Sequence, residues 1–365
     1  MTQPILLNPG PVNVHASVKH AIGGEDWCHR EPEFFVLQDR VRAGIVRALE
    51  LDQARWASIL MSGSGTCAVE AMIASLVPRG RALLVVSNGV YGERIAKIAR
   101  AHEIEVVEVK SDPSVAPDLA RIEAAIVAAK SSGVQLAAIA AVHHETTTGL
   151  INPVASIGEL ADKYRLAYLL DSVSGLAGEA IDLDAAHVTA AACTANKCFE
   201  GLPGICFVVV RRHAIADVAS EPERSLYLHL PTYLEKQEQH DTPFTPAVQV
   251  LMALDVAVEL LEKETVAARI RRYHGYARIV REGMANIGLS LWLPPELRSN
   301  TITTIAMPEG ATYEQLHDAM RAEGFVIYAG QGDLRTRAFR IANMGQLDER
   351  ELERAVVVLA RAIRR

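Results

Sequence analysis

The chain alternates short, continuous apolar runs with longer amphipathic segments, and this alternation limits the folds open to it. Continuous apolar runs suit strands buried on both faces of a mainly parallel sheet, and amphipathic segments between them suit crossover helices. We therefore predict an α/β fold with a large layered domain at 16–250, preceded by an N-terminal arm at 1–15. The predicted strands cover 56–62, 82–87, 105–109, 136–143, 166–171, 188–194 and 205–210, and the predicted helices cover 66–77, 92–103, 116–131 and 153–164.

The chain from residue 211 onward has a different pattern. Residues 211–247 are polar, rich in Glu and His, and contain four prolines, which predicts irregular structure reaching toward a partner subunit. Beyond them we expect connecting helices and a smaller C-terminal α+β domain within 251–365. The predicted long helices that connect to it are about 248–263 and 267–287. The small domain itself has predicted helices at 312–323 and 349–364 and predicted strands at 301–307, 325–329 and 339–344.

Composition and charge exclude several classes of partner. Half of the residues are hydrophobic and the net charge is −7, with the basic residues scattered except for Arg269, Arg271 and Arg272. That group indicates a solvated helix face, so no nucleic-acid partner is predicted. No apolar run reaches the ~20 residues that a membrane span needs, and the N-terminus lacks a secretory signal. Five cysteines without a Cys-x-x-Cys pair predict reduced thiols in a cytoplasmic protein.

Lys197 is the first candidate for chemistry. It lies in AACTANKCFEGLPG, among small and apolar residues after a predicted strand, with no other Lys or Arg between Arg165 and Arg211. An isolated lysine is most often a solvated surface charge. Apolar surroundings disfavour the ammonium form, however, and would lower the pKa of this amine, as a Schiff-base lysine requires.

Asp171 ends the apolar run LAYLLD, at the sheet edge where open α/β folds bind ligands. Taken alone, it reads as a turn or helix-capping residue. Together with Lys197 it forms the minimal pair for a pyridine cofactor, because a carboxylate beside a ring nitrogen keeps that nitrogen protonated.

Residues 62–66, Ser-Gly-Ser-Gly-Thr, follow a strand and open a helix. Glycines let the backbone approach closely, and the helix N-terminus offers free N–H groups to a phosphate. The alternative is a plain strand-to-helix turn. GSGTCA also fits a dinucleotide-binding fingerprint, but residues 82–91 supply none of the acids that NAD binding needs.

Further candidates follow other strands. Tyr91 in SNGVYGER could stack on a cofactor ring or be ordinarily half-buried. HHETTTG at 143–149 places Glu145 and three threonines at the same sheet edge. Its two histidines lack a second cluster nearby, so no metal site is predicted. Arg340, in an apolar strand, could bind a carboxylate or phosphonate, or form a structural ion pair.

These segments together resemble the class V aminotransferases of fold type I. The resemblance rests on residues 6–14, 62–71, 87–94, 143–153, 169–175, 194–204, 243–249, 324–332 and 339–345. It implies a three-layer large domain, a mainly parallel central sheet and a smaller C-terminal domain. It also implies pyridoxal 5′-phosphate as cofactor and a homodimer with a shared active site.

The resemblance implies a role for each matched residue. Lys197 would hold the cofactor, Asp171 would contact the pyridine nitrogen, and Tyr91 would stack on the ring. Thr146 would lie near the hydroxyl edge of the ring, and Arg340 would bind the substrate carboxylate. The phosphate would be held by Ser64, Gly65, Thr66 and Asn196, and by Thr245 of the neighbouring subunit.

Within the family, the segments are most similar to members that transfer the amine of 2-aminoethylphosphonate to pyruvate, giving phosphonoacetaldehyde and L-alanine. One departure is DWCHREPEF at 26–34, which continues as in alanine–glyoxylate and serine–pyruvate aminotransferases and makes Arg30 either a second anion contact or part of an ion pair. These activities, or that of a related class V lyase, are the alternative. An NAD-dependent dehydrogenase and a noncatalytic protein of this fold are the remaining hypotheses.

Overall fold

The computed structural model describes residues 4–364, so residues 1–3 of the predicted N-terminal arm lie outside it. In these described residues the largest sheet has seven strands, in the order β2-β10-β9-β8-β5-β3-β4. All neighbours pair in parallel except β10, which is antiparallel to both β9 and β2. The predicted α/β fold with a mainly parallel sheet is confirmed. The strands are β2 (Trp56–Gly63), β3 (Ala82–Ser87), β4 (Glu105–Lys110), β5 (Leu136–Val142), β8 (Ala167–Asp171), β9 (Ala190–Thr194) and β10 (Gly204–Arg211).

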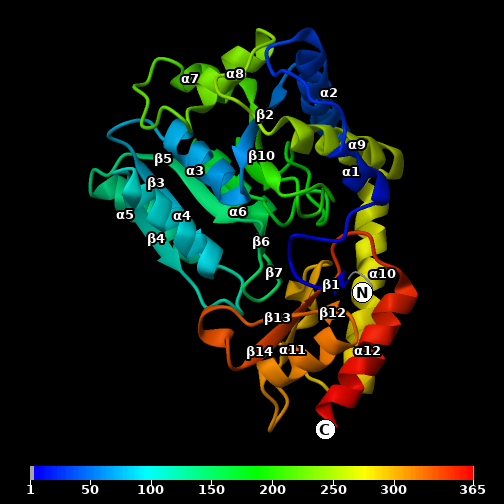
Figure 1. Cartoon of the computed structure of the whole chain (residues 1–365). Coiled ribbons are helices and arrows are strands. Elements are labelled where there is room, and N and C mark those ends of the chain that lie inside the picture. Colours follow the sequence, from blue (N-terminus) through cyan, green and yellow to red (C-terminus); the bar gives the residue numbers. More distant parts are fainter. Residues whose placement is uncertain (1–3, 365) are drawn as a thin grey trace.

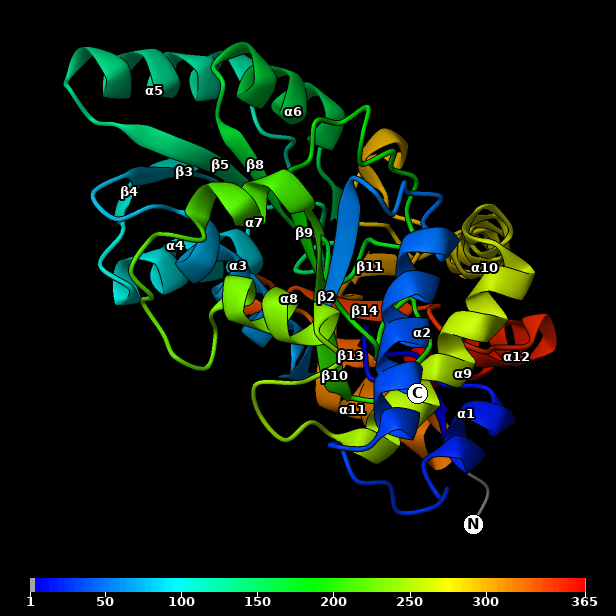
Figure 2. The ribbon, with the colours of Figure 1, turned by 90° about the horizontal axis from the view of Figure 1, so that it is seen from above.

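Helices cover both faces of this sheet and give three layers (Figures 1 and 2). Alternate residues of β3 show why its apolar run is continuous: Leu83 and Val85 belong to one core cluster, and Leu84 and Val86 to the other. The first face is covered by α3 (Gly65–Leu76), α4 (Val90–Ala101), α7 (Arg212–Val218) and α8 (Leu230–Glu238). The second is covered by α2 (Pro32–Ala48), α5 (Leu119–Ser131), α6 (Val154–Lys163) and α9 (Val248–Glu264).

The C-terminal part contains a three-stranded sheet, β11-β14-β13, flanked by helices. The predicted single strand at 325–329 was wrong, because Ile327 divides it. Residues before it pair in parallel with β1 (Ile5–Leu6), and residues after it pair with β14. The elements are α10 (Val266–Asn286), β11 (Ile302–Ala306), α11 (Tyr313–Ala322), β12 (Phe325–Val326), β13 (Tyr328–Ala329), β14 (Ala338–Ala342) and α12 (Glu349–Ile363).

The prediction that 211–247 is irregular was only partly correct, because α7 and α8 lie within it. In α8 the buried Leu230, Tyr233, Leu234 and Gln237 recur at helical spacing, and its proline sits in the first turn, where no backbone N–H is needed. The prediction also omitted α2 and the short helix α1 (Ala16–Ala21).

The parallel strands place their following loops at one edge of the sheet. Val142 of β5 pairs with Asp171 of β8, and Asp171 pairs with Ala192 of β9, so these strand ends are in register. Gly63 at the end of β2 pairs with Gly204 at the start of β10. This edge therefore collects the loops that carry the predicted site residues.

No helix within residues 4–364 combines the length and apolar character needed to cross a bilayer. In the same residues, no group of three or more His, Cys, Asp or Glu side chains is arranged to hold a metal ion.

Candidate active site

Lys197 lies in the short loop that joins β9 to β10. Its neighbours Cys198 and Phe199 are buried, and its own side chain is partly buried. The N-terminal segment covers the lysine stem. A Cβ atom on Gly10 would lie 2.9 Å from both Cδ and Cε of Lys197, and Gly10 has a φ of 111°. Only glycine fits this conformation and this close approach without strain.

The surroundings of Lys197 favour its neutral amine. Burial is the main cause that lowers the pKa of Lys197 to about 8; Cys198 and Asp171 act to raise this pKa, and Arg340 and Arg94 act to lower it. Among the described residues no carboxylate forms an ion pair with this amine within 4 Å. The lysine therefore supplies a nucleophile or a base near neutral pH.

Asp171 is buried at the end of β8 and faces the same edge. Burial raises the pKa of its carboxyl to about 6, although Arg94 and Lys197 act to lower it. One oxygen, Oδ1, accepts a hydrogen bond of 3.1 Å from the N–H of Val173. Asp171 therefore also stabilises a turn, which was the alternative role considered from its sequence context. The other oxygen has no protein donor among the described residues and is available to a ligand.

The N-terminus of α3 adjoins this carboxylate. Ser64 precedes the helix without a side-chain hydrogen bond to it, so N–H groups of the first turn remain open. A Cβ atom on Gly65 would lie 2.6 Å from Cγ1 of Val173, which explains the glycine. Thr66 Oγ1 accepts a hydrogen bond of 3.2 Å from Arg94 Nη1. This turn offers backbone N–H groups, hydroxyls and a nearby cation to an anion.

Tyr91 lies in the first turn of α4, and Glu145 fixes that turn. Glu145 Oε2 accepts hydrogen bonds from the N–H groups of Tyr91 (3.2 Å) and Gly92 (3.4 Å). Its other oxygen accepts bonds from the N–H (3.1 Å) and hydroxyl (2.6 Å) of Thr147. Glu145 thus caps α4 from the short strand β6 (His144–Glu145), a role that the local sequence did not indicate.

Arg340 is buried on β14 and forms no ion pair within 4 Å among the described residues. Its Nη1 donates to the carbonyl of Thr146 (2.6 Å), and its Nε donates to the carbonyl of Ala329 (3.0 Å). Among the described residues Arg340 therefore does not form the structural ion pair that its sequence context offered as an alternative to ligand binding. Burial lowers the pKa of this guanidinium, and a carboxylate ligand would relieve that cost.

These side chains form one site at the carboxyl edge of the sheet, and comparison with known proteins identifies its class. Residues 39–335 match the model of the family described as aminotransferase class-V. The chain belongs to the class V aminotransferases. It is 33% identical over 363 residues to the 2-aminoethylphosphonate–pyruvate transaminase of Bacillus thuringiensis (strain Al Hakam), covering 98% of each chain.

Solved structures agree with the class V fold. The alanine–glyoxylate aminotransferase from Nostoc sp. matches with a TM-score of 0.92 and 25% identity, covering 100% of this chain and 96% of that one. The pyridoxamine–pyruvate aminotransferase from Mesorhizobium loti matches with a TM-score of 0.87 and 25% identity, covering 99% and 91%. The resemblance drawn from sequence is confirmed.

Class V aminotransferases depend on pyridoxal phosphate, and the residues present fit that group. Thr146 Oγ1 and His144 Nε2 are buried without a hydrogen-bond partner among the described residues. Buried polar atoms usually have such a partner, so these two atoms are suited to bind a polar ligand at this edge. The open turn of α3 suits the phosphate, the unpaired amine of Lys197 suits the aldehyde, and the open oxygen of Asp171 suits the ring nitrogen.

The structure does not bring every predicted residue into this class V site. Arg30 is exposed and pairs with Asp241 and with the carbonyl of Thr242 (3.2 Å), so the ion-pair interpretation holds in this chain. Thr245 is exposed, and its reach to a partner subunit stays a prediction. Asn196 Oδ1 accepts a hydrogen bond of 2.8 Å from Thr194 Oγ1 beside the lysine.

Three contributors were missed from the sequence: Val173, Arg94 and Gly10. Val173 follows Asp171 by two residues, and both Val173 and Tyr91 are partly buried apolar side chains of the same cluster. Arg94 follows Tyr91 by one helical turn, a spacing that predicts a shared face. The role of Gly10 could not be recognised from its neighbours in sequence, because it packs against Lys197, which is far away along the chain.

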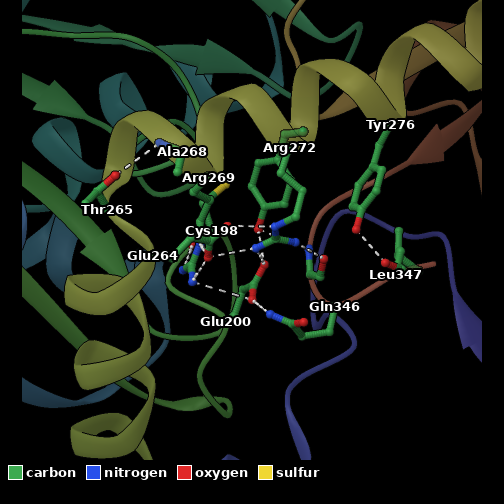
Figure 3. Close-up of polar contacts among 12 residues, drawn as sticks. Cys198, Glu200, Glu264, Thr265, Ala268, Arg269, Arg272, Tyr276, Gln346 and Leu347 are labelled. Carbon is green, nitrogen blue, oxygen red and sulfur yellow. Dashed lines mark hydrogen bonds and ion pairs between the residues drawn. The ribbon is translucent and has the colours of Figure 1, made fainter. Parts of the chain in front are cut away.

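A buried ionic network contacts the residues that follow Lys197 and stabilises their loop (Figure 3). Its centre is Glu200, three residues after the lysine, which is 4% exposed. Arg269, almost fully buried, donates to the carbonyl of Cys198 (2.9 Å) and pairs with Glu264 (2.7 Å). The donors to Glu200 are Arg272 Nη2 (2.8 Å), Tyr273 Oη (2.6 Å) and Gln346 Nε2 (2.5 Å).

Two buried histidines should make the fold sensitive to acid. Burial lowers the pKa of His143 to about 4 and that of His144 to about 3. A histidine in the unfolded chain has a pKa of ~6.5. Between that pH and the lower pKa of the folded state, the unfolded chain binds protons that the folded chain does not, so the free energy of unfolding falls as the pH drops from ~6.5 toward 4. For His143 the loss between pH 7.5 and pH 5 should be about 2 kcal/mol.

Replacing His143 by asparagine removes that titration, because asparagine takes up no proton and can still bond Ser172 Oγ, which His143 Nδ1 contacts at 2.9 Å. Urea unfolding at the two pH values should show a smaller difference for His143→Asn than for the wild type. The exposed His20→Asn should leave the difference unchanged. Equal differences in wild type and His143→Asn would contradict this assignment.

Proposed function

We propose that the protein binds pyridoxal 5′-phosphate at this site and transfers the amine of 2-aminoethylphosphonate to pyruvate, giving phosphonoacetaldehyde and L-alanine. The observation that carries the proposal is the unpaired, buried guanidinium of Arg340 at the edge that also holds Lys197 and Asp171. Pyruvate and alanine each present a carboxylate for it. The named transaminase of Bacillus thuringiensis, similar over nearly the whole chain, supports the choice of donor.

Each side chain has a defined task in this proposal. The bound cofactor supplies a protonated ring that draws electrons from the carbon losing its proton. Lys197 would hold the cofactor through its amine at rest, and the same amine, when free, would hold and move a proton at Nζ. Its lowered pKa suits both tasks. Asp171 keeps the ring nitrogen protonated.

The remaining residues bind and orient. Ser64, Gly65, Thr66 and Asn196 hold the phosphate, and Thr146 offers its unpartnered hydroxyl to the hydroxyl edge of the ring. Tyr91 and Val173 give the ring two apolar contacts. We further propose a homodimer in which Thr245 of the partner subunit completes the phosphate site, because this residue is exposed and the adjacent Phe244 stacks on Tyr227, which is itself 41% exposed.

A second candidate keeps the chemistry and changes the substrates. The Nostoc alanine–glyoxylate aminotransferase has the same fold over the whole chain. In addition, Arg30 is engaged by Asp241 and offers no free second cation to a phosphonate. An alanine–glyoxylate or serine–pyruvate aminotransferase is therefore the alternative.

A donor panel tests the proposal. Steady-state rates with 2-aminoethylphosphonate, serine and alanine, each with pyruvate and with glyoxylate, should give the highest kcat/KM for 2-aminoethylphosphonate and pyruvate. Arg340→Lys should raise the KM for pyruvate about 10- to 100-fold, because a charged, forked contact is worth ~1.5–3 kcal/mol. A preference for alanine and glyoxylate would replace the proposal with the second candidate.

A further inference from the structure

We propose that Arg94 is an additional ligand of the cofactor phosphate, acting beside the N-terminal turn of α3. This inference rests on the proposed binding of pyridoxal phosphate. It is carried by the contact between Arg94 Nη1 and Thr66 Oγ1 at 3.2 Å and by the absence, among the described residues, of a carboxylate within 4 Å of the Arg94 guanidinium.

The position of Arg94 is fixed by α4. It lies one turn after Tyr91, and its guanidinium carbon is 4.7 Å from the centre of the Tyr91 ring. Stacking on an aromatic ring holds the guanidinium plane and leaves the donors at its rim free. One of those donors reaches Thr66, and the others have no protein acceptor among the described residues. The fork is therefore oriented before any anion arrives.

The charge of a phosphate ester is better balanced by a guanidinium than by a helix N-terminus alone. A phosphate ester carries up to two negative charges near neutral pH, while a helix N-terminus contributes only about half a positive charge. The hydroxyls of Ser64 and Thr66 are neutral donors. A guanidinium at the edge of the same turn supplies a full positive charge and charge-assisted hydrogen bonds.

The phosphate of the cofactor is a better match than the phosphonate of a substrate. Arg94 touches Thr66, which belongs to the first turn of α3, where the phosphate is expected. Arg340, the other unpaired guanidinium, instead contacts Thr146 and Ala329. The two cations thus contact different segments of the site, and each would serve a different anion.

Binding to the cofactor-free protein tests this role without using turnover. Affinities for pyridoxal phosphate and for pyridoxal, which lacks the phosphate, are measured by titration for wild type, Arg94→Ala and Arg94→Lys. Arg94→Ala should weaken pyridoxal phosphate about 10- to 100-fold and pyridoxal less than about 3-fold. Arg94→Lys should fall between wild type and Arg94→Ala, since it keeps the charge and loses the fork.

Two controls separate the possible outcomes. Arg100→Ala removes an arginine from the same helix, where it pairs with Glu108 at 2.7 Å, and should bind both ligands as the wild type does. Inorganic phosphate should raise the melting temperature of the cofactor-free wild type more than that of Arg94→Ala. If Arg94→Ala does not fold, Arg94→Lys and Arg94→Gln carry the comparison.

The inference is overturned if Arg94→Ala weakens pyridoxal phosphate and pyridoxal equally, or weakens neither. It is also overturned if the only change is a higher KM for 2-aminoethylphosphonate, which would assign Arg94 to the substrate. A wild type that binds neither pyridoxal phosphate nor pyridoxal would instead contradict the proposed function, so the two failures are distinguishable.

Discussion

Lys197→Ala should lower the transamination rate by on the order of 10⁴-fold or more, because in the proposed function one substitution removes both the amine that would bond the cofactor and the base that would move the proton. The purified variant should also lack the absorption band of a lysine-bound cofactor. Both changes are measured on protein loaded with pyridoxal phosphate, by steady-state kinetics and by absorption spectroscopy.

Two further variants show whether the effect belongs to this amine. Lys197→Arg keeps a positive charge but cannot bond the aldehyde, so it should be as inactive as Lys197→Ala. Lys97→Ala removes an exposed lysine from α4 and should match the wild type. A Lys197→Ala protein that retains the band and full turnover would disprove the assignment.

Glu200→Ala should cost about 3–5 kcal/mol of unfolding free energy, the usual penalty for breaking a buried ion pair from one side. Arg272 and the buried Arg269 would keep Glu264 as their remaining acidic partner, and the hydroxyl of Tyr273 would lose its acceptor. Urea unfolding of wild type and variant in the same cofactor state measures the difference.

The matched control is Glu123→Ala, since Glu123 bonds Lys163 and Tyr164 on the surface and its loss should change stability little. Glu200→Gln keeps one acceptor oxygen and should lose less stability than Glu200→Ala. If Glu200→Ala and Glu123→Ala unfold at the same urea concentration, the network contributes no net stability.

The central sheet was predictable because its strands lie between helices on both faces. That environment requires runs that are apolar at every position, and such runs are visible locally, as 82–87 shows. The pair of Lys197 and Asp171 was predictable for a related reason. Parallel strands place their ends at one edge, so polar residues that end apolar runs must meet there.

The features that the sequence could not predict are contacts between residues that are far apart along the chain. The sequence left Arg30 as either an anion contact or part of an ion pair, because its partner Asp241 lies about 200 residues away along the chain. Glu200 gave no sign of its network, because Arg272 and Gln346 come from α10 and from the segment before α12. The division of 325–329 likewise depends on β1, at the opposite end of the chain.

The pairing of β1 with β12 means that the N-terminal segment cannot reach its final place until β12 has been synthesised. The N-terminal segment is made first, yet its neighbours are made last: Leu7 accepts the N–H of Ala342, and Asn13 accepts that of Gln346, each at 2.8 Å. At 5–20 residues per second the wait is on the order of half a minute. We therefore expect the N-terminal segment to take its final place over Lys197 late in synthesis, after the strands of the central sheet have been made.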